Sequence, residues 1–241
     1  FKCLGLNNIS TKNGDSIEVL HQLNSVSVLF LDPARRNSNG GKVVSMADCE
    51  PNVLELCDEM VEKSHFVVLK LSPMLDWHSA VAQLKYVTEV HIVSVGNECK
   101  ELLLVLTDRN KTAKGCKSNT IQIFCVNDND VFNYEEGIYS EGENIPQQRI
   151  LARNATLPPY LYEPNASIMK AGCFAQLSET YDVAALGHNS HLFVSPNFLP
   201  HFPGRKFQIV NVFTLNKKEL RRALAGMTQA NIAVRNFPMR V

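Results

Sequence analysis

A carboxylate, a proline and two arginines follow an apolar stretch near the start of the chain. Residues 26–32 read VSVLFLD, and Asp32 is followed directly by Pro33, Ala34, Arg35 and Arg36. Carboxylates accept protons and hydrogen bonds, and guanidinium groups bind phosphates in a bidentate way. The pattern therefore fits either a charged turn at the end of a strand or the rim of an active site.

Alternating strand and helix patterns must position these residues. A continuous apolar run such as 26–32 is typical of a strand that is buried on both faces. Strands separated by helices predict parallel pairing in an open α/β sheet, whose ligands lie at the carboxyl ends of the strands. Three places fall at such ends: Gly14-Asp15, residues 32–36 and Ser72-Pro73. The expected elements are a strand in 9–16, a helix in 17–23, a strand in 26–32, a helix in 50–64, a strand in 66–73 and a helix in 75–87.

The remainder of the chain follows a different pattern. It predicts a hairpin over 89–107, a further strand at 120–126 and a connection between domains over 127–160. One helix is expected over 165–181, a short strand within 190–195 and a longer strand within 202–215. The last helix should begin after Asn216 as its N-cap and bury a stripe of apolar residues, with a further strand starting near residue 230. That stripe consists of Leu220, Ala223, Leu224 and Met227.

The charge of the chain is divided unevenly, although its formal net charge is zero. Residues 205–241 hold eight Lys or Arg and one acid, a net +7, and residues 1–204 hold the other 16 basic and 23 acidic side chains, a net −7. Such a basic end favours a polyanionic partner, with a solvated basic surface as the alternative. Seven scattered cysteines without a Cys-x-x-Cys pair indicate reduced thiols and a cytoplasmic protein, and the absence of a long apolar run predicts no membrane segment.

Five segments in order carry a family resemblance. They are FLDPARRNSNGGKVVSMADCEP, VVLKLSPMLD, YLYEPNASIMKAG, HFPGR and ANIAVRNFP. Together they resemble a class I S-adenosylmethionine-dependent methyltransferase that carries a THUMP-like C-terminal domain. The resemblance implies an incomplete Rossmann-like α/β sheet over 1–134, a small α+β, ferredoxin-like module over 135–204 and the start of a basic THUMP-like domain over 205–241.

The resemblance also implies roles for individual residues. Asp15 would accept a hydrogen bond from the adenine amino group of S-adenosylmethionine, although a turn residue before a helix is an equally good interpretation of it. Asp32 would contact the cofactor and act with Pro33 and Arg35 in catalysis, orienting the nucleophile or taking its proton. Arg36 would hold a substrate phosphate. RNA contacts would come from the basic face of the last helix, which comprises Lys217, Lys218, Arg221 and Arg222. No metal is expected.

Departures from the family pattern limit these expectations. The Gly-rich loop and the acidic ribose-binding residue that precede this part of the fold are not in the sequence, so the chain alone should bind S-adenosylmethionine poorly. Cys57 falls on the apolar stripe of a helix, which disfavours covalent catalysis by a cysteine. Direct transfer to an oriented nitrogen or oxygen of RNA is expected, with two alternatives: a non-catalytic RNA-binding protein on a vestigial scaffold, or a small-molecule methyltransferase with an oligomerisation domain. The oligomeric state is left open.

Overall fold

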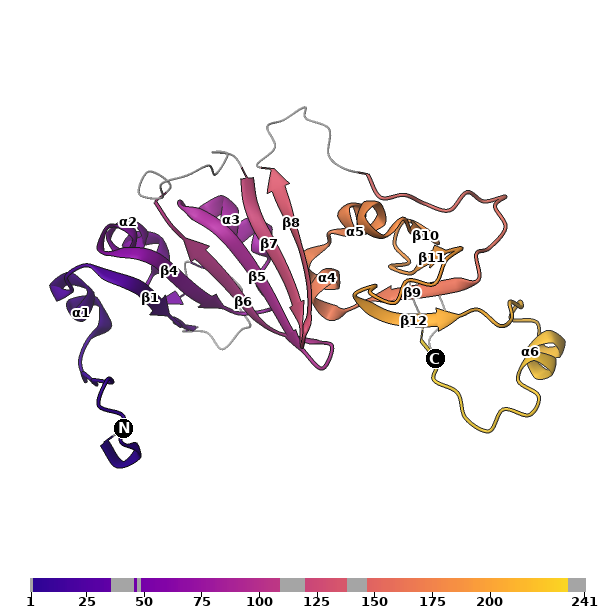
Figure 1. The fold of residues 1–241 in the computed structure, drawn as a ribbon, viewed down its shortest axis with the longest axis horizontal. Helices are drawn as coiled ribbons and strands as arrows, with labels where there is room; N and C mark the ends of the chain where they lie inside the picture. Colours follow the sequence, from indigo (N-terminus) through magenta and orange to yellow (C-terminus); the bar gives the residue numbers. More distant parts are fainter. Residues whose placement is uncertain (1, 36–45, 47–48, 109–119, 138–146, 234–241) are drawn as a thin grey trace. The chain divides into compact units, whose positions relative to one another are not determined.

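The computed structural model describes residues 2–35, 46, 49–108, 120–137 and 147–233. Two compact units are formed, one by Phe1–His91 with Glu101–Gln122 and the other by Ile92–Lys100 with Ile123–Val241. Strands alternate with helices in the first unit, and a small antiparallel sheet with short helices follows in the second (Figure 1).

A six-stranded mixed sheet with the strand order β1-β4-β6-β5-β7-β8 contains the parallel pair β1–β4. Strand β6 pairs antiparallel with β4, so the predicted hairpin β5–β6 places its second strand inside the sheet. The α/β prediction is confirmed. The elements are η1 (Lys2–Leu4), α1 (Ser16–Gln22), β1 (Val26–Leu31), β2 (Ala34–Arg35), β3 (Cys49–Glu50), α2 (Val53–Lys63), β4 (Ser64–Leu71), α3 (Trp77–Gln83), β5 (Val87–Val95), β6 (Glu98–Leu106), β7 (Thr120–Asn127) and β8 (Asp130–Gly137).

Helix α2 packs on one face of the sheet at β4. Asn52 caps its N-terminus by accepting from the Leu54 N–H, and four residues of its apolar stripe are buried, while Leu56 is half-buried. Leu29 pairs with Val67 in register, and alternation along β4 leaves its odd-numbered residues 67, 69 and 71 buried. This face forms the core of the first unit. The buried side chains of α2 are Val53, Cys57, Met60 and Val61.

The opposite face of β1 and β4 is open to solvent. Val28, Phe30 and Phe66 are 55%, 59% and 44% exposed. The prediction that residues 26–32 are buried on both faces is therefore wrong for the described part of the chain. The physical reason is that β1 lies at the edge of the sheet, and no described helix packs on this face. An apolar strand composition showed that burial is favourable but could not show which element would provide it.

Residues 9–14 do not form the predicted strand. They are exposed and lead directly into α1, and among the described strands none pairs with the free side of β1. A polar segment without a partner strand gains no ladder of hydrogen bonds. Helix α1 is instead attached to α2 through Lys63, whose Nζ donates to the carbonyl oxygens of Leu20 and His21 at 2.8 and 2.7 Å.

The second unit contains an antiparallel sheet with the order β10-β11-β9-β12. The single helix predicted over 165–181 is two helices, because Gly172 adopts a left-handed conformation (φ 73°) that ends the first of them. Part of the predicted connection 127–160 forms β8, and the predicted long strand ends at Gln208. The elements are β9 (Tyr160–Pro164), α4 (Ala166–Ala171), α5 (Phe174–Tyr181), β10 (Ala184–Ala185), β11 (Phe193–Ser195), β12 (Gly204–Gln208) and α6 (Lys217–Ala223).

Two of the five segments that carry the family resemblance pack on each other here. β9, from YLYEPN, pairs with β12, from HFPGR, and the buried Glu163 carboxylate forms an ion pair with Arg205. A Cβ at position 204 would collide with the Glu163 carbonyl oxygen, which explains the glycine. The Tyr162 hydroxyl donates to the Asn197 carbonyl oxygen at 2.8 Å. These segments therefore have a structural role in the small sheet.

The last helix forms where predicted but does not bury its apolar stripe. The Asn216 side chain accepts from the Lys218 N–H as the predicted N-cap. No residue of α6 is buried, and Leu224 and Met227 are 42% and 57% exposed. The predicted core stripe is therefore wrong among the described residues, and the strand expected near residue 230 is not formed over 230–233. In the described part of the chain, no helix has the length and apolar composition to cross a bilayer.

Candidate functional site

Asp32 lies immediately after β1, at the carboxyl end of the parallel pair, which is where the sequence predicts a site. Its Oδ2 atom accepts a hydrogen bond from Lys70 Nζ on β4 at 2.8 Å. The Lys70 ammonium also lies 3.7 Å from a carboxylate oxygen of Glu101 on β6. Alternation along the strands places Asp32 and Lys70 on the same face as Phe30 and Phe66, the open face of the sheet.

This ion pair is accessible to solvent. The side chains of Asp32 and Lys70 are 54% and 32% exposed. The hydrogen bond to Asp32 raises the pKa of Lys70, with a smaller contribution from Glu101, so the lysine is cationic at neutral pH. Because an exposed pair is screened by water, it contributes little to folding stability. The position of the ion pair at the carboxyl end of the strands therefore says more about function than its small contribution to folding stability does.

The turn after Asp32 is only partly described. Pro33 is buried, and Ala34 and Arg35 form β2, which pairs with Glu50 and Cys49 of β3. Only the backbone of Arg35 is described, and Arg36 lies outside the described residues. The predicted contacts of these two arginines with substrate stay predictions.

Asp15 is the N-cap of α1. Its Oδ1 atom accepts from the Ile17 N–H at 2.7 Å and, more weakly, from the Glu18 N–H at 3.4 Å. Within the described residues, its Oδ2 atom has no hydrogen-bond partner. The local interpretation, a turn residue before a helix, is thus confirmed for one oxygen, while the other is able to accept a hydrogen bond from a ligand.

A pocket of about 160 Å³ brings Asp15 next to the turn that follows Asp32. It is lined on one side by Asp15, Ser16 and Ile17 and on the other by Ala34, Glu50 and Pro51. Two carboxylates in one small pocket suit a ligand that presents N–H donors, such as the amino group of adenine. Sequence analysis did not identify Glu50, because its position in the pocket depends on the pairing of β2 with β3.

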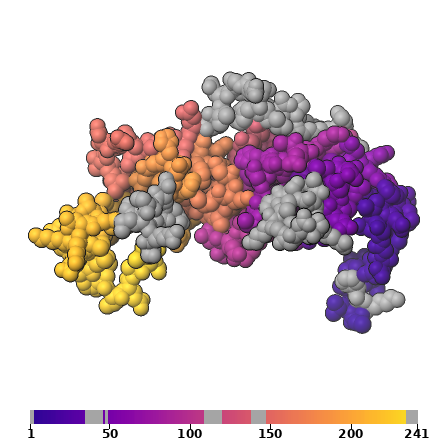
Figure 2. All heavy atoms as spheres, turned by 180° about the vertical axis from the view of Figure 1, so that it is seen from behind, coloured from indigo at the N-terminus to yellow at the C-terminus, as the bar shows by residue number. Residues whose placement is uncertain are grey.

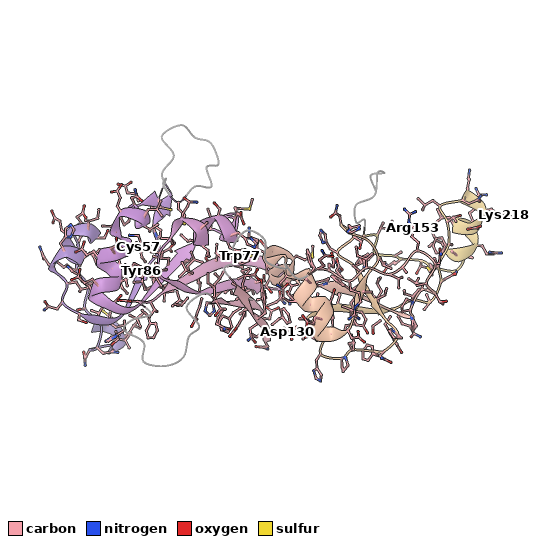
Figure 3. The ribbon with its side chains drawn as sticks, turned by 90° about the horizontal axis from the view of Figure 1, so that it is seen from above. Cys57, Trp77, Tyr86, Asp130, Arg153 and Lys218 are labelled. Carbon is pink, nitrogen blue, oxygen red and sulfur yellow. The ribbon has the colours of Figure 1, made fainter. Side chains whose placement is uncertain are left out.

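Ser72, at the carboxyl end of β4, and Cys57 both have structural roles. Ser72 Oγ accepts from the Met74 N–H at 3.1 Å and so stabilises the turn after the strand. Burial, followed by the neighbouring Asp58 carboxylate, raises the pKa of the Cys57 thiol, which donates to the Lys85 carbonyl oxygen. Cys57 and Tyr86 both belong to the first unit, where they are labelled in Figure 3. Cys57 is a core residue, as predicted.

A second candidate surface is the basic face of α6. All four of its predicted RNA-contacting side chains are exposed, and Lys218 points away from the helix into solvent (Figure 3). The helix start is fixed by Glu219, whose carboxylate accepts from the hydroxyl and the N–H of Thr214 at 2.8 and 3.1 Å. These bonds lower the pKa of Glu219. This segment lies at the molecular surface, in yellow in Figure 2.

Comparisons with known proteins agree with this architecture. Residues 160–203 match a ferredoxin-like domain family and residues 204–241 match a THUMP domain-like family. Over 94% of its length the chain is similar to a crystal structure of a putative methyltransferase from Porphyromonas gingivalis W83, with 29% sequence identity and a TM-score of 0.76. No curated protein matches the chain.

The chain spans about half (54%) of the length of that structure. It has a mixed α/β fold similar to a methyltransferase structure, followed by ferredoxin-like and THUMP-like regions, so the family resemblance seen in the sequence is confirmed at this level. The domain boundaries predicted at residues 134 and 204 stay predictions. The comparisons name no site residue.

Proposed function

We propose that this chain, with its methyltransferase-like sheet and THUMP-like region, belongs to an enzyme that transfers a methyl group from S-adenosylmethionine to RNA. The observation that carries the proposal is the placement of Asp15 and the turn after Asp32 around one pocket at the carboxyl end of a parallel strand. Ligands of open α/β sheets bind at this place. Similarity to a methyltransferase structure supports the same reaction class.

The cofactor fits the residues at this site. Asp15 Oδ2 would accept from the adenine amino group, while Asp15 Oδ1 continues to cap α1. When bound, S-adenosylmethionine supplies an electrophilic methyl group, which passes to the substrate nucleophile as the methyl–sulfur bond breaks and the sulfur keeps the electron pair. Asp32 would orient the nucleophile through a hydrogen bond and receive the proton that it loses. Catalysis of this kind relies mainly on positioning.

RNA is the proposed substrate because of the second surface. Four exposed cations on one helix face suit contacts with successive phosphates of a folded RNA. The match to a THUMP domain-like family over residues 204–241 supports this choice. Arg35 and Arg36, which follow Asp32 in the sequence, would add phosphate contacts next to the reacting atoms. The free thiols of the described cysteines support a reducing, cytoplasmic location as part of the proposal.

Calorimetric titration tests the proposal. S-adenosylmethionine and S-adenosylhomocysteine are titrated into this chain and into the complete encoded polypeptide, and transfer of a tritiated methyl group to total RNA from cells that lack the gene is then measured. Binding and transfer by the complete polypeptide are expected. If it bound RNA but neither ligand, it would be a non-catalytic RNA-binding protein, and the proposed reaction would be wrong.

A further inference from the structure

The Asp32 carboxylate is bonded to protein through one oxygen only. Lys70 Nζ donates to Oδ2 at 2.8 Å, and in the described part of the chain no group donates to Oδ1. The two residues are 38 positions apart in sequence, and the parallel pairing of Leu31 with Leu69 brings them together. A carboxylate that is bonded at one oxygen has a restricted rotation and a defined free acceptor.

Lys70 is itself held between two carboxylates. Glu101 on β6 lies 3.7 Å from the ammonium, which is beyond the usual length of a direct hydrogen bond but within reach of an ionic interaction. The antiparallel register of β4 and β6, in which Lys70 is opposite Leu103, fixes this placement. A lysine with two acidic neighbours stays cationic. Of the two carboxylates, Asp32 is the direct hydrogen-bond partner, because its contact is the shorter one.

We propose that Lys70 is a positioning residue, which holds Asp32 Oδ2 so that Oδ1 is the atom that receives the hydrogen bond and then the proton of the methyl-accepting group. This inference rests on the proposed function. It assigns to Lys70 a role that stability does not explain, because an exposed ion pair contributes little to folding. Its position at the carboxyl end of the parallel strands, next to the candidate catalytic carboxylate, is where such a role is useful.

Substitution of Lys70 in the complete polypeptide tests the role. Lys70→Met keeps the length of the side chain but removes the charge and the donor, and Lys70→Arg keeps both. The matched control is Lys85→Met, which removes a comparable exposed pair with Asp58 at 3.0 Å. Single-turnover methyl transfer to total RNA from cells that lack the gene, affinity for S-adenosylhomocysteine and the melting temperature are measured for each variant. The ionisation of Lys70 is followed by NMR in wild type and in Asp32→Asn.

Loss of a hydrogen bond to a charged group corresponds to a decrease of about ten- to a hundredfold in rate. We therefore expect this decrease in the methyl-transfer rate for Lys70→Met, a smaller decrease for Lys70→Arg and none for Lys85→Met. The affinity for S-adenosylhomocysteine and the melting temperature should be unchanged in all three variants. In Asp32→Asn the pKa of Lys70 should fall, because its main hydrogen-bond partner loses its charge.

The two failures are distinguishable. A wild type that methylates RNA together with an equally fast Lys70→Met variant would overturn the role of Lys70 and leave the proposed function intact. If Lys70→Met lost S-adenosylhomocysteine affinity or melting temperature together with its rate, the role of Lys70 would be structural. That result would also overturn the inference. A complete wild-type polypeptide that binds neither ligand and transfers no methyl group would overturn the proposed function and the inference with it.

Discussion

The Asp15 carboxylate accepts the Ile17 N–H at 2.7 Å through Oδ1, and Asp15 lines a pocket together with Ala34 from the turn after Asp32. One side chain therefore combines a local structural bond with a free acceptor. A helix cap has to be an oxygen acceptor, and recognition of an amino group needs a second one. A carboxylate provides both, whereas an amide provides only one.

Substitutions of Asp15 should separate these two uses. Asn is as good an N-cap as Asp, but its amide NH₂ would then face the pocket and oppose an amino group of the ligand. We expect Asp15→Asn to keep the melting temperature and to weaken S-adenosylhomocysteine binding about tenfold or more. Asp15→Ala should lose about 0.5–2 kcal/mol of unfolding free energy as well. Calorimetry and thermal unfolding of the complete polypeptide measure both; unchanged affinity in Asp15→Asn would exclude Asp15 from the binding site.

Asp32 is expected to be required for the reaction and not for the fold. Its side chain is 54% exposed and its ion pair with Lys70 is screened by solvent, so Asp32→Ala should leave the unfolding free energy within about 0.5 kcal/mol of wild type. Methyl transfer by the complete polypeptide should be abolished. The control is Asp58→Ala, which removes the partner of Lys85 on the same unit. Retained transfer by Asp32→Ala would contradict the assignment of the catalytic carboxylate.

The basic face of α6 should govern affinity for RNA. Replacing Lys217, Lys218, Arg221 and Arg222 by Gln removes four exposed cations without affecting the cap at Asn216. Affinity for structured RNA should fall, and the slope of log K against log salt should decrease by about 0.9 for each lost phosphate contact in a duplex. Filter binding over a salt series measures it. A variant with Lys12, Lys85, Lys100 and Arg153 changed to Gln serves as a charge-matched comparison, because these four cations are also exposed. An equal loss of affinity in both variants would disprove a specific face.

The attachment of α1 to α2 should depend on pH through Glu59. The His21 imidazole and the Lys63 ammonium lower the pKa of this carboxyl below 4.5. A lowered folded pKa means that the unfolded state binds the proton more tightly, so the contribution is complete above the unfolded value and is lost as the pH falls through the folded value. Urea midpoints of wild type and Glu59→Gln should therefore differ at pH 7 and converge as the pH falls below the usual titration range of a glutamate carboxyl.

The control for this prediction is Glu179→Gln, an exposed carboxylate on α5. Its midpoint should follow that of wild type at both pH values. A constant difference between wild type and Glu59→Gln from pH 7 to pH 3 would mean that the bonds to His21 and Lys63 do not stabilise the folded protein.

Local sequence was sufficient for the start of α6 and for the end of β1. Asn216 caps α6 as predicted, because its side chain only needs an N–H two residues ahead. Asp32 falls at the end of a strand because an apolar run ends there, and the placement of a ligand site at the carboxyl end follows from the alternation of strands and helices. Such features depend on neighbours in the sequence, which the sequence itself shows.

Tertiary structure alone decided which of these residues meet. Lys70 reaches Asp32 only because β4 lies parallel to β1 in a particular register, and Glu101 joins them only because β6 is inserted beside β4. Glu50 enters the Asp15 pocket through the pairing of β2 with β3. Burial of the apolar side chains of Val28 and Phe30 would be favourable, but whether they are buried depends on what packs on the open face of β1 and β4. Which strands pair, and which elements pack on each face of the sheet, depends on long-range contacts. These are determined by the free energy of the whole sheet and not by the composition of a single strand.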